Sequence, residues 1–136
     1  MRYNVFSIIE PEEVRLIAFS DVASVPQEMM CGANIEYAIS RFVAPVAGQE
    51  LLEAISRGEY EELKTKFVQV AVALYVRYIS GYDGEENALR LLTRARHFLK
   101  QMSLHLEINS SSYKEYNGCE NILNRCKIHG DLVQIL

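Results

Sequence analysis

The chain has 136 residues, of which 49% are hydrophobic and 24% are charged, and its mean hydropathy is close to zero (−0.03). These values fit one folded domain with a hydrophobic core, and they exclude a wholly disordered chain. The net charge of −4, from 14 basic and 18 acidic residues, lacks the basic excess that is typical of nucleic-acid-binding proteins.

Charge is unevenly distributed along the chain. Residues 1–85 carry 7 basic and 13 acidic side chains, a net charge of −6, whereas residues 86–136 carry 7 and 5, a net charge of +2. This asymmetry is consistent with polar contacts of opposite sign at two ends of the molecule. Ordinary solvated helix faces would give the same pattern.

Cysteine usage and hydropathy predict a cytoplasmic protein without a membrane span. On a shared helix Cys119 and Cys126 would lie about 10 Å apart, beyond the reach of a disulfide, and Cys31 leaves an odd count, so we expect reduced thiols. The first ten residues lack the features of a signal peptide. The most apolar stretch, Phe67 to Ile79, has 13 residues, fewer than the roughly 20 that span a bilayer.

The N-terminal elements are only partly predictable. Residues 3–9 are rich in strand-favouring side chains, but the run is short. Pro11 followed by Glu12 and Glu13 indicates a helix start, with carboxylates near the positive end of the helix dipole. Residues 14–19 lack clean periodicity, so helix and strand both remain open for them.

Two helices are expected next. The sequence Ser24-Val-Pro-Gln27 matches a capping box, and apolar residues recur at helical spacing over Ile35–Val43. We expect Pro45 to end this helix, because the residue before a proline is disfavoured in the α conformation. A short helix is predicted over Gln49–Arg57, with Gly58 as its C-terminal cap.

The second half predicts two long helices and a tail. A helix over Glu59–Ser80 is apolar nearly all round, which indicates a central position. Asp83 and Glu86 resemble another capping box, at the start of a helix over Gly84–Leu106. Residues 110–136 are expected to form one or two short helices that dock loosely. The predicted fold is therefore all-α: one compact domain over residues 1–136, a bundle of about four main helices with a short helical C-terminal tail.

Motifs for catalysis or cofactor binding are not found. Cys119, Cys126 and His129 are potential zinc ligands, but their spacing is wrong for a structural zinc site and a fourth ligand is missing. Paired glutamates fall in predicted first turns, where the helix dipole explains them. Phosphate-binding, dinucleotide-binding and nucleophile motifs are absent from the sequence. We expect a non-enzymatic protein with no metal and no cofactor.

The most informative polar feature is a basic stripe on the fourth predicted helix, where no acidic residue occurs between Asn87 and Gln101. It suits an acidic partner surface or a nucleic-acid backbone, although a solvated face with cations near the negative end of the helix is the simpler interpretation. Two tyrosines in the tail are further interface candidates, because amphipathic aromatics suit such surfaces. The candidate interface residues are Arg90, Arg94, Arg96, His97, Lys100, Tyr113 and Tyr116.

Three segments resemble the small helical head–tail connector (adaptor) proteins of tailed phages and prophages. Residues Ile35–Leu52 resemble the family's helix, x-P-x-x-G turn and short helix, and Glu62–Tyr78 resembles the long apolar helix that follows. Leu104–Asn109, with Tyr113 and Tyr116 after it, is similar to the tail of an uncharacterised prophage branch.

The resemblance implies a non-enzymatic subunit that forms a ring beneath the portal, in the cytoplasm or the virion. Its partners would be copies of itself and portal or neck proteins; nucleic acid is not expected as a partner. Acidic and basic faces of neighbours would meet head to tail. A generic interaction or regulatory module, contacting nucleic acid through the fourth helix, is the alternative, and an enzyme comes third.

Overall fold

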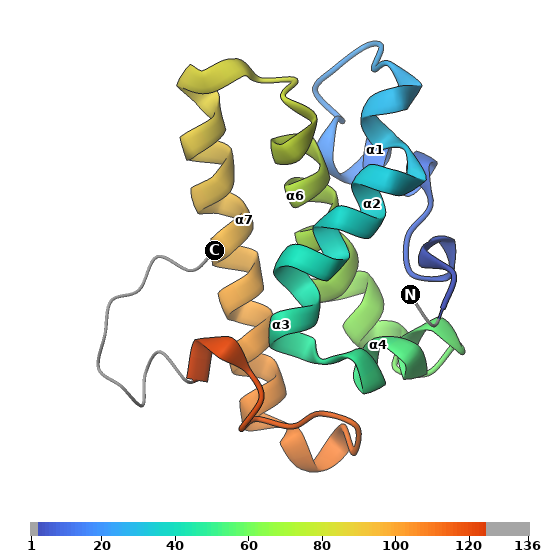
Figure 1. Ribbon diagram of the computed structural model, residues 1–136, viewed down its shortest axis with the longest axis vertical. Helices are drawn as coiled ribbons and strands as arrows, with labels where there is room; N and C mark the ends of the chain where they lie inside the picture. The colour runs from blue at the N-terminus through green and yellow to red at the C-terminus, as the bar shows by residue number, and fades with distance from the viewer. Residues whose placement is uncertain (1–2, 125–136) are drawn as a thin grey trace.

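The structure is a computed structural model that describes residues 3–124. Throughout this range the ordered elements are helices and no strand occurs, which confirms the predicted all-α class. Figure 1 shows α7 along one side of the molecule, α6 beside it, and the N-terminal elements on the far side of α6.

The N-terminal segment is helical. The strand-favouring run forms a 3-10 turn, η1 (Val5–Ser7), because the Asn4 side chain accepts a hydrogen bond from the backbone N–H of Phe6 and caps the turn. Helix α1 (Pro11–Ala18) settles the open question over residues 14–19 in favour of helix for 14–18, with Phe19 as the C-cap. Its start is fixed by a capping box in which the Glu13 carboxylate accepts from the N–H of Glu10.

The capping box expected at Ser24 does not start a helix. Gln27 instead opens a 3-10 turn, η2 (Gln27–Met30), without a side-chain cap, and the next helix begins only at Gly32. The turn is held by Asn34, whose side-chain amide donates to the Met29 carbonyl at 2.9 Å. The hydrogen bond from Asn34 therefore holds this turn in place of the capping box that the sequence suggests.

Pro45 does not end the following helix, contrary to expectation. Helix α2 (Gly32–Ala38) continues through a π-helical stretch, η3 (Ile39–Val43), into α3 (Ala44–Ala47), and the helical run stops at Gly48 with φ +87°. The N–H of Ala44 reaches back five residues to the Ile39 carbonyl. This wider turn gives the proline ring room that a regular α-helix would deny it.

The remaining helices follow the predicted order. The short helix is α4 (Gln49–Ser56). The central one begins at Glu61 and comprises α5 (Glu61–Leu63), a second π-helical stretch η4 (Lys64–Val68) and α6 (Gln69–Ser80). Helix α7 (Gly84–Ile108) and the 3-10 turn η5 (Ser110–Ser112) complete the elements. Gly81, in the left-handed conformation, separates α6 from α7.

Helix α6 occupies the centre, as its nearly uniform apolar sequence predicts. Residues Ala71–Val76 are all buried, and α6 packs against α1, α2 and α7. The ring of Tyr75 stacks on Phe42 with centroids 4.1 Å apart, which ties α6 to the π-helical stretch η3. The core therefore surrounds α6, and one side of α7 is not part of it.

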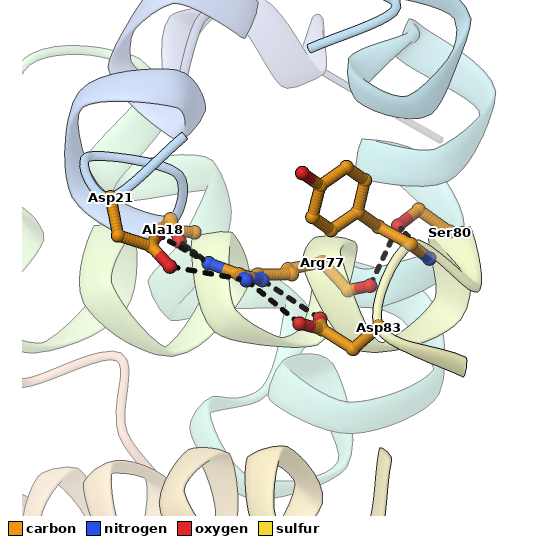
Figure 2. A network of polar contacts seen from close by, with 6 residues as sticks. Ala18, Asp21, Arg77, Ser80 and Asp83 are labelled. Carbon is orange, nitrogen blue, oxygen red and sulfur yellow. Dashed lines mark hydrogen bonds and ion pairs between the residues drawn. The ribbon is translucent and has the colours of Figure 1, made fainter. Parts of the chain in front are cut away.

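Arg77, near the end of α6, joins three parts of the chain (Figure 2). Its guanidinium donates two hydrogen bonds to the Asp83 carboxylate, at 2.8 and 2.7 Å, and others to Asp21 and to the Ala18 carbonyl. Asp83 therefore does not cap α7 as the sequence suggested, because its carboxylate is engaged by Arg77.

Candidate interaction surface on helix α7

Helix α7 has one buried and one exposed face. Leu92, Ala95, Leu99, Met102 and Leu106 recur at helical spacing and are buried against the rest of the molecule. The side chains that lie opposite them on the helix form its outer face, because the buried side chains face α6, against which α7 packs.

The outer face of α7 carries four of the predicted interface residues. Arg90, Arg94, His97 and Lys100 are all exposed. Within residues 3–124, neither arginine nor Lys100 forms an ion pair. Arg94 lies near enough to Asp21 to contribute to the lowered pKa of that carboxyl, which is chiefly due to the hydrogen bond from Arg77.

Arg96 occupies a different place. It is only partly exposed and, by helical spacing, lies at the border between the buried and outer faces. We therefore separate it from the other four candidates.

The outer face also presents three apolar side chains that the sequence reasoning missed. Leu89, Leu104 and Ile108 are 67%, 49% and 71% exposed. Leu104 and Ile108 follow Lys100 at intervals of four residues, so the three side chains share one line along the helix. This four-residue spacing could have identified Leu104 and Ile108 from the sequence. The outer face is thus basic and apolar together, the combination found where proteins bind acidic partners.

Tyr113 and Tyr116 are used inside the molecule. The Tyr113 hydroxyl lies 2.7 Å from His105 Nε2, its ring meets Tyr60 edge to face, and burial raises its pKa. Tyr116 is 9% exposed and donates to Glu107 at 2.6 Å. Residues 110–124 are held against α7 and α5 by these contacts, and Tyr116 presents no free surface. The expected tail beyond them, residues 125–136, lies outside the described residues.

A strained residue anchors this segment. Tyr60 adopts the left-handed conformation (φ 57°, ψ 49°), which is uncommon for a bulky side chain, and its hydroxyl donates to Glu115 Oε1 at 2.6 Å. The hydrogen bond raises the pKa of Tyr60 to about 12 and lowers the pKa of Glu115. The Tyr60 hydroxyl keeps its proton and donates the hydrogen bond, which favours the ionised form of Glu115 and fixes its position.

A pocket of about 270 Å³ lies where Glu115 meets the start of α4. Three carboxylates line it, from Glu50, Glu115 and Glu120, together with the amides of Gln49 and Asn117. No basic residue lines it, and Val46 is its one large apolar residue. We call it the acidic pocket. The sequence did not reveal it, because its walls come from two segments, residues 46–50 and 115–120, that lie far apart in the chain.

Only part of the potential zinc pattern lies within the described residues. No group of three or more histidine, cysteine or acidic side chains among residues 3–124 is placed to hold a metal ion. Cys31 and Cys119 are free thiols. Cys126 and His129, which completed the weak zinc pattern, lie outside the described residues. Over the same range no helix has both the length and the apolar character needed to cross a membrane.

No family model matches the sequence, and comparison with curated proteins and with solved structures gives no match for the chain. The function proposed below therefore rests on this chain's own residues.

Proposed function

We propose that this chain is a non-enzymatic assembly subunit that docks on an acidic protein surface through the outer face of α7. The observation that carries the proposal is the composition of that face. Arg90, Arg94 and Lys100 stand exposed without an ion pair in the described chain, beside apolar side chains of which two are more than 60% exposed.

The two components of the face have different roles. Unpaired cations speed encounter with an acidic surface and exclude basic ones, so they set rate and specificity. The apolar side chains of Leu104 and Ile108 lose water on contact and supply affinity. Together they favour a protein partner, because a nucleic-acid backbone gains little from exposed leucine and isoleucine.

The more specific form of the proposal is a ring-forming subunit like the head–tail connectors that the sequence resembles. An all-α fold with a basic face on helix α7 supports this form. Its partners would be further copies of the chain and portal or neck proteins, in the cytoplasm or in a virion.

Nucleic acid is the second candidate partner, and the same exposed arginines favour it. The two candidates separate by salt dependence. Binding through phosphates falls steeply and linearly on a log–log plot as salt rises, with a slope close to the number of phosphates contacted. We expect only weak, non-specific binding of duplex DNA, which would disappear at physiological salt.

Sedimentation velocity over a concentration series tests the proposal. We expect wild-type chain to associate and R90E/R94E to remain monomeric, because both cations on the face are reversed. R41E/K66E, which reverses two exposed cations on η3 and η4, changes the net charge equally and should associate as wild type does. Equal behaviour of the two variants, or a wild type that stays monomeric throughout, contradicts the proposal.

A further inference from the structure

The acidic pocket and the outer face of α7 are complementary in charge. We propose that the acidic partner is a second copy of this chain, whose acidic pocket receives Arg90 and Arg94 of the first. This inference rests on the proposed function and adds the identity of the partner and of the receiving surface.

The acidic pocket brings together carboxylates that form no ion pair within the described chain. Six acidic residues of the described chain are neutralised by ion pairs with neighbouring cations: Glu12, Asp21, Glu59, Glu61, Glu62 and Asp83. Glu50 and Glu120 form no ion pair within residues 3–124, and both face the same hollow. Clustered carboxylates without cations repel one another, so an arriving guanidinium relieves that repulsion as well as forming its own contacts.

The pocket is built to stay charged. Glu115 is held ionised by the Tyr60 hydroxyl, which lowers the pKa of the carboxyl. Glu50 lies in the first turn of α4, where the positive end of the helix dipole stabilises a carboxylate. The Glu115 carboxylate is therefore ionised and held in place before a partner arrives.

The size and lining of the pocket favour a protein side chain as its occupant. Pockets for cofactors and small molecules are mostly apolar and measure roughly 300–1,000 Å³. This one lies at the low end of that range, at about 270 Å³, and differs in being lined mainly by carboxylates and amides. Arginine suits it, because the planar guanidinium can bind two carboxylate oxygens at once.

Within one copy of the chain, Arg90 and Arg94 cannot reach the acidic pocket. Gly118, beside the pocket, lies against the Glu107 carboxylate near the C-terminal end of α7. Arg94 precedes Glu107 by 13 residues, about 20 Å along the helix at 1.5 Å per residue, and Arg90 lies one turn further away. Arg90 and Arg94 on the one hand, and the acidic pocket on the other, therefore lie toward opposite ends of α7. A contact between them joins different copies head to tail.

Charge exchange across this contact tests the inference by sedimentation velocity. We expect R90E/R94E alone and E50R/E120R alone to weaken association about tenfold or more, because each places like charges opposite one another. The quadruple variant R90E/R94E/E50R/E120R has the wild-type net charge, and its acidic and basic surfaces are exchanged, so it should associate again.

An equimolar mixture of the two double variants should also associate. E28R/E36R, which reverses two exposed acids elsewhere, is the control for E50R/E120R and should behave as wild type.

The outcomes separate the inference from the proposed function. If R90E/R94E dissociates while E50R/E120R associates normally, the acidic pocket is not the receiving surface and the docking role of α7 stands. If neither double variant differs from wild type, or if the wild type is monomeric, both are overturned. The inference is also overturned if both double variants lose association and the quadruple variant does not recover it, provided that circular dichroism shows the quadruple variant to be folded.

Discussion

Arg77 is the polar side chain that most closely links separate parts of the fold. Its side chain is 12% exposed and that of its main partner, Asp83, is 16% exposed, so the pair lies largely out of water. The guanidinium also lies over the rings of Phe19 and Tyr82, at 5.0 and 5.3 Å from their centroids. Ion pair, backbone contact and ring stacking all depend on one planar cation.

Replacing Arg77 by methionine should therefore destabilise the fold strongly. The change leaves the Asp83 carboxylate and the Ala18 carbonyl without their donor, and we expect a loss of about 3 kcal/mol in the free energy of unfolding, measured by urea titration. R77K should recover little, since an ammonium cannot make the bidentate contact. R15M, which removes only an exposed pair with Glu12, is the matched control and should leave the urea midpoint nearly unchanged. Equal midpoints for R77M and R15M would contradict this account.

The Tyr60–Glu115 hydrogen bond predicts a particular pH dependence. The folded-state pKa of Glu115 is lowered, so its stabilisation is fully present above the usual value near 4.5 and is lost as pH falls through the lowered pKa. The pKa of Tyr60 is raised from 10.0 to about 12, so its stabilisation is present below pH 10 and is lost as pH rises toward 12.

Y60F removes the hydroxyl and keeps the ring, so it isolates this bond. We expect wild type to have the higher urea midpoint at pH 7, and the difference from Y60F to shrink both below pH 4 and above pH 10. Y37F, at an exposed tyrosine without a hydrogen bond in the described chain, should show no such pH-dependent difference. A difference for Y60F that is constant with pH would mean that the hydroxyl acts only through packing.

Among the elements, those governed by local signals were predictable from the sequence. Helix α4 was placed to within one residue, because Gly48 and Gly58 bound it and its apolar spacing is regular. The outer face of α7 followed from helical periodicity alone, and the expected exposure of Arg90 and Arg94 is what the structure shows.

Features that depend on particular side-chain contacts or on an irregular helical turn were not predictable. Asp83 has the sequence context of a cap, but Arg77 takes its carboxylate. Pro45 should stop a helix, but a π-helical stretch before it absorbs the misfit. Tyr116 was expected at the surface, but Glu107 and Asn121 engage its hydroxyl inside the molecule. At Asp83 and Tyr116 a side-chain partner outweighed the local preference, and at Pro45 the backbone of the helix adjusted. The acidic pocket was missed because its walls lie far apart in the sequence.

At the scale of the whole molecule, charge and apolar surface are separated along α7. The acidic pocket lies near its C-terminal end, the basic side chains lie in its N-terminal and central turns, and Leu104 and Ile108 lie on the outer face between them and the end of the helix. A contact made by such a surface has a part that salt screens and a part that salt leaves intact. At about 0.1 M salt the screening length is about 10 Å, and at 1 M it is about 3 Å.

These two parts should separate experimentally. We expect association of the wild-type chain to weaken between about 0.05 and 0.5 M salt without disappearing, because the apolar contact persists when the charges are screened. L104S/I108S should lose this residual association, a weakening of about tenfold or more, since each buried apolar side chain contributes about 1.5–3 kcal/mol. L16S/Y37S removes comparably exposed apolar side chains from α1 and α2 and should associate as wild type does. If both double variants weaken association equally, exposed apolar side chains in general are responsible. If only L104S/I108S weakens it, the contact lies on the outer face of α7, where the charges that salt screens and the apolar side chains belong to the same surface.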